Sequence, residues 1–599
     1  MTYAAITPAH LDWRGNTPYA AAFDDIYYST DGGVGQSQHV FLHGNGLPEA
    51  WRGRERFVIL ETGFGSGLNL LATWAAWLAD PEACPQLHYL AAEKHPFTAA
   101  DLTQLHAQHP EFAPLSAELI ARWPPLTPGF HRLDLAEGRL RLTLLFGDAN
   151  TTLPQVVAKV NAFYLDGFAP AKNPDLWSPS LLRQIARLAA AHATLATWCV
   201  AGPVRRALQE AGFRLEKSVG FGAKREMLRG QLIATRTRNT RPTYPPGHAL
   251  IIGAGLAGSS AAYALARRGW QVTVIDRHAQ IAQGASGNPA GIVRPTLSLD
   301  DNLNARLTRA AFLYACQTWP RHPGQPRWSP CGVVQRAGTE AAYHHRLCSD
   351  LALPPEFVHA IKDDLCFPRA GWAAPPSVCA ANLAACGTHL TLRVGLDVAS
   401  LHPYAEAWHA HDANGASIAV ADIVILASGA DLQPLAGLAL QRTRGQVTLV
   451  SAADLSAPET VLCQDGYVIP PVEGRVCVGA SYDLERDPTP NLAAQEANLV
   501  RLETLVPDYQ RSADEPLNRV SFRAVTPDRM PLIGALAEPG LYALTGLASR
   551  GLVWSPLAGE ILASQISGEP LPIEKALARA IDPLRFPPVS DSYPIKTAA

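Results

Sequence analysis

Short apolar runs alternate with glycine-rich turns and helix-like stretches in two parts of the chain. The segment "RFVILETGFGSGLNLLATWAAW" (56–77) has an apolar run, a glycine turn and then a second apolar stretch of helical length. The segment "HALIIGAGLAGSSAAYALARRGWQVTVIDR" (248–277) has the same order and adds another apolar run. Runs of this length that enter glycine turns are typical of buried parallel strands. We therefore expect two α/β units, the second beginning almost 250 residues into the chain.

The second segment carries a dinucleotide-binding fingerprint. Gly253, Gly255 and Gly258 form a G-x-G-x-x-G turn, and the next apolar run ends on Asp276, 23 residues after the first of these glycines. The glycines allow a tight turn and let a pyrophosphate approach the helix N-terminus, while the Asp276 carboxylate accepts hydrogen bonds from a ribose. The combination predicts a Rossmann unit that binds a dinucleotide.

Later segments favour FAD over a nicotinamide. "ASGNPAGIVRP" (285–295) is a glycine-rich loop, "ADIVILASGA" (421–430) is a buried run, and "GLYALTGLASRGLVWSPLAGEILA" (540–563) adds a strand, a turn and a helix. The chain thus comes back twice to the phosphate-binding sheet, with a long β-rich insertion in between. In this order of segments it resembles flavin-linked amine oxidases of the glycine and sarcosine oxidase type. The resemblance implies an inserted, mainly antiparallel β-sheet domain for the substrate. It also implies further FAD contacts from Ser286, Asn288, Gly291, Gly429 and Gly551.

The first glycine turn has a different spacing and resembles motif I of S-adenosyl-L-methionine-dependent methyltransferases. Its glycines form G-x-G-x-G, and the next apolar run ends near an acid whose carboxylate can hold ribose hydroxyls. The resemblance implies a Rossmann-like methyltransferase fold. The expected cofactor contacts are Glu61, Gly63, Gly65, Gly67, Asn69, Glu93 and Asp148. A nicotinamide-binding Rossmann unit is the alternative.

Asp166, at the end of the apolar run "VNAFYLD", is the candidate catalytic residue of this unit. An alkylamine with a pKa of about 10 is protonated at neutral pH, and freeing its lone pair costs about 4 kcal/mol. A carboxylate accepts an amine hydrogen and orients the lone pair toward a methyl donor. Phe168 is expected to wall the pocket. In the alternative interpretation, "DGFAP" is an Asx-type turn after a strand.

A basic, proline-rich stretch separates the two units. "TRTRNTRPTYPPGH" (235–248) lacks apolar periodicity and is typical of a linker. We expect a methyltransferase domain at 1–235, a linker at 236–247, an oxidoreductase domain at 248–585 and a tail at 586–599. The segment from 214 to 241 contains eight basic residues but only two acidic ones, Glu216 and Glu226. The eight are Arg214, Lys217, Lys224, Arg225, Arg229, Arg236, Arg238 and Arg241. They either contact nucleic-acid phosphates or form a solvated strand and linker.

Composition excludes several classes of protein. Hydrophobic residues make up 47% and charged residues 17%, as in folded globular chains, and the net charge of -3 gives no overall attraction to DNA. The ten cysteines occur singly, without zinc-site spacing, so we expect no metal and a reducing, cytoplasmic location. The start lacks a secretory pattern, and glycines interrupt the uncharged stretch 249–266, so we expect no membrane association.

Two catalytic units in this order resemble the bifunctional tRNA 5-methylaminomethyl-2-thiouridine biosynthesis proteins. The resemblance covers nearly the whole chain and is carried by "YYSTDGG", "VFLHGNGLPEAW", "ETGFGSGLN", "DGFAPAKNPDLW", "FGAKREM", "IIGAGLAGSS", "ASGNPAGIV" and "GLASRGL". It implies that the FAD unit removes the carboxymethyl group of 5-carboxymethylaminomethyl-2-thiouridine at the tRNA wobble position. The methyltransferase then methylates the exposed amine.

The resemblance also implies substrate residues. Arg523 matches the arginine of related glycine oxidases that holds a carboxylate, Tyr467 matches their substrate tyrosine, and Arg550 approaches the flavin or substrate. A purely structural role is the alternative for each. We expect a monomer that binds tRNA, with Lys224 and Arg225 at the phosphates. Two other functions remain open: a metabolic fusion acting on free sarcosine-like amines, and an N-terminal unit that binds tRNA without catalysis.

Overall fold

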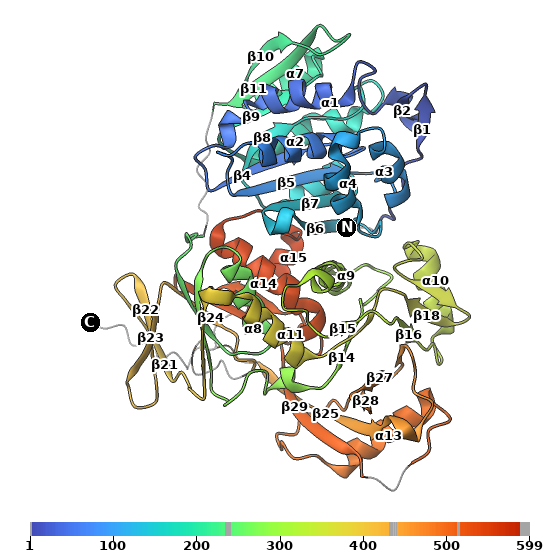
Figure 1. Cartoon of the computed structure of the whole chain (residues 1–599), viewed down its shortest axis with the longest axis vertical. Coiled ribbons are helices and arrows are strands. Elements are labelled where there is room, and N and C mark those ends of the chain that lie inside the picture. Colours follow the sequence, from blue (N-terminus) through green and yellow to red (C-terminus); the bar gives the residue numbers. More distant parts are fainter. Residues whose placement is uncertain are drawn as a thin grey trace. The chain divides into compact units, whose positions relative to one another are not determined.

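The chain forms two compact units, seen in a computed structural model that describes residues 3–233, 241–430, 435, 438, 440–511 and 515–586. The first unit contains Tyr3–Arg241 together with Glu569–Lys575, and the second contains Pro242–Gly568 and the chain from Ala576 on. Figure 1 colours the chain along its sequence and labels its elements. Arg236 and Arg238 lie outside the described residues, together with the rest of 236–240 in the expected linker and with the expected tail after residue 586.

The first unit is built on an eight-stranded sheet with the order β10-β11-β9-β8-β4-β5-β7-β6. Its central strands run parallel, whereas β6, β10 and β11 lie antiparallel to their neighbours. The strands are β4 (Arg56–Glu61), β5 (Gln86–Glu93), β6 (Gly129–Leu135), β7 (Leu140–Phe146), β8 (Val160–Tyr164), β9 (Ala189–Thr197), β10 (Phe213–Val219) and β11 (Glu226–Leu232).

Alternate residues of β4 enter two separate cores, as the two-residue period of a strand requires. Phe57 and Ile59 belong to one apolar cluster, and Val58 and Leu60 to the other. Because both faces of the sheet are covered, its strands read as continuous apolar runs. The helices of this unit are α1 (Gly33–Gln36), α2 (Leu68–Ala79), α3 (Ala99–His106), α4 (Ala113–Ile120), α5 (Ala149–Thr152), α6 (Pro179–Leu188) and α7 (Gly202–Glu210).

The second unit contains a six-stranded sheet with the order β20-β13-β12-β24-β31-β30. All neighbouring strands are parallel except β30 and β31. Helices α8 and α14 pack against each other, and a Cβ at Gly559 would lie 2.5 Å from the Ser260 carbonyl oxygen, so this close approach requires glycine. The elements are β12 (His248–Ile252), α8 (Leu256–Ala266), β13 (Gln271–Asp276), β20 (Leu390–Val394), β24 (Ile423–Leu426), β30 (Leu532–Ala535), β31 (Leu541–Thr545) and α14 (Gly551–Ser567).

Between the strands of this sheet the chain forms a second eight-stranded sheet, with the order β17-β18-β16-β26-β27-β28-β25-β29. Only β16 and β26 pair in parallel, which confirms the expected mainly antiparallel insertion. Helix α13 (Leu492–Leu505) packs on it. The strands are β16 (Val333–Gln335), β17 (His359–Ile361), β18 (Asp364–Phe367), β25 (Gln441–Ser451), β26 (Val461–Cys463), β27 (Tyr467–Val472), β28 (Arg475–Gly479) and β29 (Leu517–Val525).

Further strands and helices complete the two units. None of the helices in the described residues combines the length and apolar character needed to cross a bilayer. The remaining strands are β1 (Asp12–Arg14), β2 (Thr17–Ala20), β3 (Asp25–Ile26), β14 (Gly291–Val293), β15 (Trp328–Ser329), β19 (Gly371–Ala373), β21 (Ser400–Tyr404), β22 (Ala407–His411) and β23 (Ser417–Ala421). The remaining helices are α9 (Leu303–Thr318), α10 (Ala341–Leu351), α11 (Pro375–Ala385) and α15 (Lys575–Ala580).

Candidate active sites

The predicted methyltransferase residues meet at the carboxyl ends of the parallel strands in the first unit. The turn after β4 needs its glycines, because Gly65 and Gly67 have φ angles of 52° and 75°, a region that L-residues rarely adopt. A cavity of about 460 Å³ opens there, a volume suited to a small ligand. Its lining includes six of the predicted cofactor-binding and catalytic residues: Gly63, Gly65, Asn69, Glu93, Asp148 and Asp166.

Glu93 joins the end of β5 to the glycine turn. Its Oε2 accepts a hydrogen bond from the Gly65 amide at 2.8 Å, and its Oε1 accepts one from the His95 amide at the same distance. Asp148 begins α5 and forms an ion pair with Lys94, with 3.0 Å between Oδ2 and Nζ. The turn and the two acids therefore present the polar groups that a sugar and an amino acid moiety require, and the residues fit the expected methyl donor.

Asp166 lies two residues after the end of β8, and its carboxylate is held from three sides. Its Oδ1 accepts hydrogen bonds from the Gly167 amide at 2.8 Å and Trp198 Nε1 at 3.2 Å, and its Oδ2 accepts one from Asn69 Nδ2 at 2.9 Å. Burial raises the pKa of Asp166 to about 6, although these hydrogen bonds oppose the shift. The carboxylate is therefore ionised at neutral pH, yet basic enough to accept a proton.

Glu61 lies behind this cavity and does not line it. Its Oε1 accepts a hydrogen bond from Asn69 Nδ2 at 2.6 Å, and its Oε2 accepts one from the Tyr89 hydroxyl at 2.9 Å. Burial, followed by the charge of Asp166, raises the pKa of Glu61 well above its usual range. In this arrangement Glu61 orients the Asn69 amide. Glu61 would therefore act on the cofactor only indirectly, by positioning Asn69. Gly67 also lies outside the lining, at the start of α2.

Aromatic side chains form one wall of the cavity. The ring of Phe168 stacks on Phe23 with 4.7 Å between centroids and meets Tyr27 edge-on at 5.3 Å. The pattern of apolar runs gives no signal for Phe23, because it precedes β4 by more than 30 residues. A tryptophan immediately after β9, Trp198, occupies a strand end like Asp166 does, and this position is the signal that could have identified it.

The two basic residues proposed for tRNA binding have different surroundings in the turn between β10 and β11. Lys224 lines the cavity, with Nζ 4.6 Å from the ring centroid of Trp198. Arg225 is exposed and does not line it. The turn is fixed by the Ala223 amide, which donates to Asp31 Oδ2 at 2.9 Å. By contrast, Lys217 on the same hairpin is paired with Glu226 at 2.7 Å.

The dinucleotide turn of the second unit has the geometry that its glycines predict. Gly253 has a φ of 112°, and a Cβ there would lie 2.6 Å from the Ala427 carbonyl oxygen. A Cβ at Gly258 would overlap the Gly253 carbonyl, so this glycine permits close packing of helix against strand although it does not line the cavity. Asp276 Oδ2 accepts a hydrogen bond from the Ala254 amide at 2.7 Å and so ties the end of β13 to the turn.

The other expected FAD residues line the same cavity, which has a volume of about 700 Å³. Ser286 Oγ accepts a hydrogen bond from the Leu256 amide at 3.0 Å at the start of α8, and Asn288 Oδ1 accepts one from Arg519 Nη1 at 2.7 Å. The glycine cradle and the acid at the strand end fit a dinucleotide. The lining includes Gly253, Gly255, Asp276, Ser286, Asn288, Gly291, Gly429 and Gly551.

Arg523, Tyr467 and Arg550 face this cavity as well. Arg523 Nη1 donates to the carbonyl oxygens of Ser481 at 3.2 Å and Arg444 at 3.4 Å. Its guanidinium crosses Gly445 so closely that a Cβ there would overlap it. Burial lowers the pKa of Arg523, and burial raises the pKa of Tyr467, whose hydroxyl therefore remains protonated and able to donate.

Positive charge accumulates in this cavity. Arg294 also lines it, and burial, followed by the charges of Arg294 and Arg529, lowers the pKa of Arg550. None of the described carboxylates forms an ion pair with Arg523 or Arg550, although the charge of Asp483, which pairs with Arg444, opposes the lowering of the Arg523 pKa. Cations shielded from water normally have a close anionic partner. A carboxylate ligand would supply it. Nowhere in the described part of the chain do three His, Cys, Asp or Glu side chains gather as metal ligands would.

Known proteins resemble the chain over both units. Residues 248–565 match the family of FAD dependent oxidoreductases, and residues 110–233 match a family of S-adenosyl-L-methionine-dependent methyltransferases. The tRNA 5-methylaminomethyl-2-thiouridine biosynthesis bifunctional protein MnmC of Azoarcus sp. (strain BH72) is 49% identical, over 97% of this chain and 98% of its own length. The protein of the same name from Aromatoleum aromaticum is 45% identical over the same shares. A solved structure, iminodiacetate oxidase from Chelativorans sp. BNC1, is 25% identical with a TM-score of 0.46, over 54% of this chain and 96% of its own.

Proposed function

The chain belongs to the family of bifunctional tRNA 5-methylaminomethyl-2-thiouridine biosynthesis proteins, and from this premise we propose that it performs two consecutive reactions on the wobble uridine of tRNA. The FAD-dependent unit converts 5-carboxymethylaminomethyl-2-thiouridine to the 5-aminomethyl nucleoside. The S-adenosyl-L-methionine-dependent unit then methylates the new amine. One observation carries the proposal: the same chain has two cavities that suit the two reactions. The FAD cavity has the cations Arg523 and Arg550, which suit a carboxylate, and the methyltransferase cavity has the carboxylate of Asp166, which suits an amine.

The first reaction is the oxidation of an N-substituted glycine. A hydride leaves the methylene carbon of the carboxymethyl group, the nitrogen loses its proton, and a C=N bond forms between the two atoms. Water then adds to this carbon and the C–N bond breaks, which releases glyoxylate and leaves a primary amine. FAD, when bound, supplies the hydride acceptor.

The residues of the second cavity position the substrate for this step. Arg523 Nη1 donates to two backbone carbonyl oxygens. The other N–H groups of its guanidinium bind the substrate carboxylate. Tyr467 donates its hydroxyl hydrogen to the same group, and Arg550 adds a second positive charge. Gly253, Gly255 and Asp276 hold the dinucleotide.

The second reaction transfers a methyl group to nitrogen. The amine lone pair forms a bond to the methyl carbon as the S–CH₃ bond of S-adenosyl-L-methionine breaks, and Asp166 accepts the hydrogen that leaves the nitrogen. Asn69, Gly167 and Trp198 fix the carboxylate, so the amine meets it in one orientation. Phe168 excludes water from one side of the amine.

Lys224 and Arg225 bind phosphates of the tRNA in this proposal. The location of Lys224 in the cavity, next to Trp198, favours a phosphate of the nucleotide that is being methylated, and exposed Arg225 suits a phosphate farther along the strand. We further propose that the protein acts as a monomer in the cytoplasm, where its tRNA substrates occur, with neither DNA nor a membrane as a partner.

Nucleoside analysis of tRNA that carries 5-carboxymethylaminomethyl-2-thiouridine tests the proposal. Without S-adenosyl-L-methionine the protein should form the aminomethyl nucleoside, and with it the methylaminomethyl nucleoside. Asp166→Ala should stop at the aminomethyl stage. Arg523→Ala should slow the oxidation about 10- to 150-fold, because a hydrogen bond to a charged group contributes about 1.5 to 3 kcal/mol.

Methylation of tRNA that already carries the aminomethyl group is the matched control for Arg523→Ala, because this residue lies in the other unit. It should proceed at the wild-type rate. If tRNA nucleosides remain unchanged while free N-methylglycine is oxidised, the protein acts on small amines and the proposal is wrong.

A further inference from the structure

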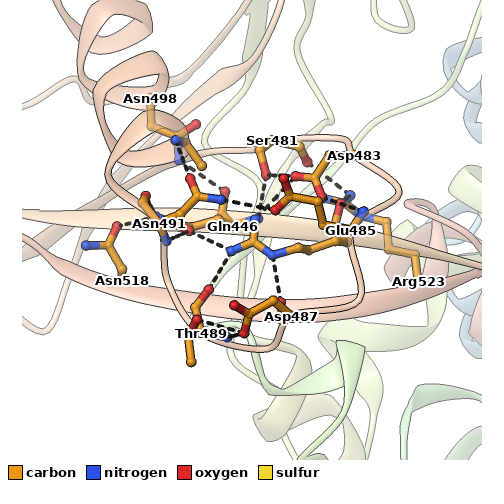
Figure 2. A network of polar contacts seen from close by, with 12 residues as sticks. Gln446, Ser481, Asp483, Glu485, Asp487, Thr489, Asn491, Asn498, Asn518 and Arg523 are labelled. Carbon is orange, nitrogen blue, oxygen red and sulfur yellow. Dashed lines mark hydrogen bonds and ion pairs between the residues drawn. The ribbon is translucent and has the colours of Figure 1, made fainter.

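The 481–491 loop, which connects β28 to α13, is locked to the inserted sheet by a buried arginine. Arg444 has no exposed surface, and its Nε donates to the Asp487 carbonyl oxygen at 2.9 Å. Its Nη2 donates to the Thr489 carbonyl oxygen at 2.7 Å, and its Nη1 lies 3.2 Å from Asp483 Oδ2. Figure 2 shows the labelled loop residues gathered around this network. One side chain thus fixes three separate points of the loop.

Gln446 on β25 holds both ends of the same loop. Its side-chain Nε2 donates to the Asn491 carbonyl oxygen at 3.1 Å, and its Oε1 accepts from the Asn491 amide at 2.9 Å. Its main-chain oxygen accepts from the Ser481 amide at 3.1 Å. With so many contacts in place, the loop has already lost the conformational freedom that a ligand would otherwise have to restrict.

This rigid loop places Tyr482 beside Arg523, which lines the oxidoreductase cavity, although Tyr482 itself does not line it. Pro488 of the loop lines the cavity, and the Ser481 carbonyl accepts from Arg523. The ring centroid of Tyr482 lies 5.4 Å from Arg523 Cζ, and Tyr482 is close enough to Arg550 to influence its pKa. Nevertheless, Tyr482 is 56% exposed. The structure therefore holds an aromatic ring, with much of its surface uncovered, next to the two cations of the substrate site.

We propose that Tyr482 is a stacking platform for a nucleobase of the tRNA anticodon loop. The inference rests on the function proposed above and extends it, since it assigns recognition of the nucleic acid by the oxidoreductase unit to a named residue. Proteins bind unpaired bases on aromatic rings and guanidinium planes, and the positive charge around Arg523 and Arg550 suits a polyanion. A neighbouring base stacked on Tyr482 would hold the modified uridine near the cavity.

The test compares three substitutions that differ in ring character. Stacking on an aromatic residue contributes about 1 to 3 kcal/mol per base, so Tyr482→Ala and Tyr482→Leu should raise the KM for tRNA oxidation about 5- to 150-fold. Tyr482→Phe keeps the ring and should retain the wild-type KM. Tyr404→Ala is the matched control, because Tyr404 is 71% exposed on a different sheet, and it should also leave the KM unchanged.

A fluorescent base reports the stacking directly. An anticodon stem-loop with 2-aminopurine next to the modified uridine should lose fluorescence on binding the wild type and Tyr482→Phe, but not Tyr482→Leu. FAD content must equal that of the wild type in each variant. If Tyr482→Leu matches Tyr482→Phe in both KM and quenching, the ring has no stacking role and the inference is overturned. If the wild type itself leaves the tRNA unchanged, the proposed function fails instead.

Discussion

At the scale of the residue, the protonation state of Asp166 decides whether an amine can be methylated. Burial raises the pKa of its carboxyl group to about 6, and only the ionised form accepts the amine hydrogen. We expect the rate of methylation at saturating tRNA to fall as the pH is lowered through about 6, in addition to the slower change that protonation of the amine imposes. The measurement is the pH profile of kcat with tRNA that already carries the aminomethyl group.

Asp166→Asn gives the control for this profile. The amide has nearly the same shape but does not titrate, so its residual activity should lack the inflection near pH 6. Trp198 and the Gly167 amide can still donate to the amide oxygen in the place of Oδ1, although the NH₂ group in the place of Oδ2 cannot accept from Asn69. An inflection of the same midpoint in the variant would assign it to another group and remove Asp166 from the proton transfer.

At the scale of the element, the hairpin of β10 and β11 carries cations with unequal roles. Loss of a cation that neutralises a phosphate should lower the slope of log affinity against log salt by roughly 0.7 to 0.9. We expect this change for Lys224→Ala and for Arg225→Ala. Only Lys224→Ala should also lower kcat of methylation, because Lys224 lies over the ring of Trp198, which donates to Asp166.

Lys217→Ala is the matched variant on the same hairpin. Its ammonium is already paired with Glu226, so tRNA affinity, salt slope and methylation should equal those of the wild type. The measurement is the affinity for tRNA at several salt concentrations, for the wild type and all three variants. Equal effects of Lys217→Ala and Lys224→Ala would mean that the hairpin contributes only general charge.

At the scale of the whole molecule, the first unit is assembled from two distant stretches of the chain. Glu569–Lys575 belongs to it, although the sequence places these residues in the expected 248–585 domain. Glu569 Oε2 lies 2.8 Å from Arg141 Nη1, and both side chains are almost completely buried. A chain that ends at 241 lacks Glu569, and removing one partner of a buried pair typically costs about 3 to 5 kcal/mol.

We therefore expect the 1–241 chain to unfold at a lower urea concentration than the same unit in the full chain, with binding of S-adenosyl-L-methionine as the probe. Arg141→Met in the shortened chain should recover part of the lost stability, because it removes the charge whose partner, Glu569, the shortened chain lacks. Equal unfolding midpoints for the shortened and full chains would show that the 569–575 segment adds no stability to the unit.

The sequence by itself determined the order of the two units and the core of each site. The G-x-G-x-x-G turn with Asp276, the G-x-G-x-G turn with Glu93, and Asp166 after its strand were all predicted. Apart from Gly67 and Gly258, these residues line one cavity in each unit. These features are local. Strand, turn and helix follow one another within about 30 residues, so apolar period and glycine position specify them directly. The carboxyl ends of parallel strands then meet at one edge of the sheet.

Only the tertiary structure decided which distant residues complete these sites. Glu61 ends its strand as predicted but lies behind Asn69, because the depth of a side chain depends on the layer packed above it. Lys224 and Arg225 are adjacent in sequence, yet only Lys224 meets the ring of Trp198, which follows β9. Tyr482 reaches Arg523 because Arg444 folds the loop back onto β25. Contacts between segments so far apart arise from packing and charge burial across the whole fold, and no periodicity within a single segment encodes them.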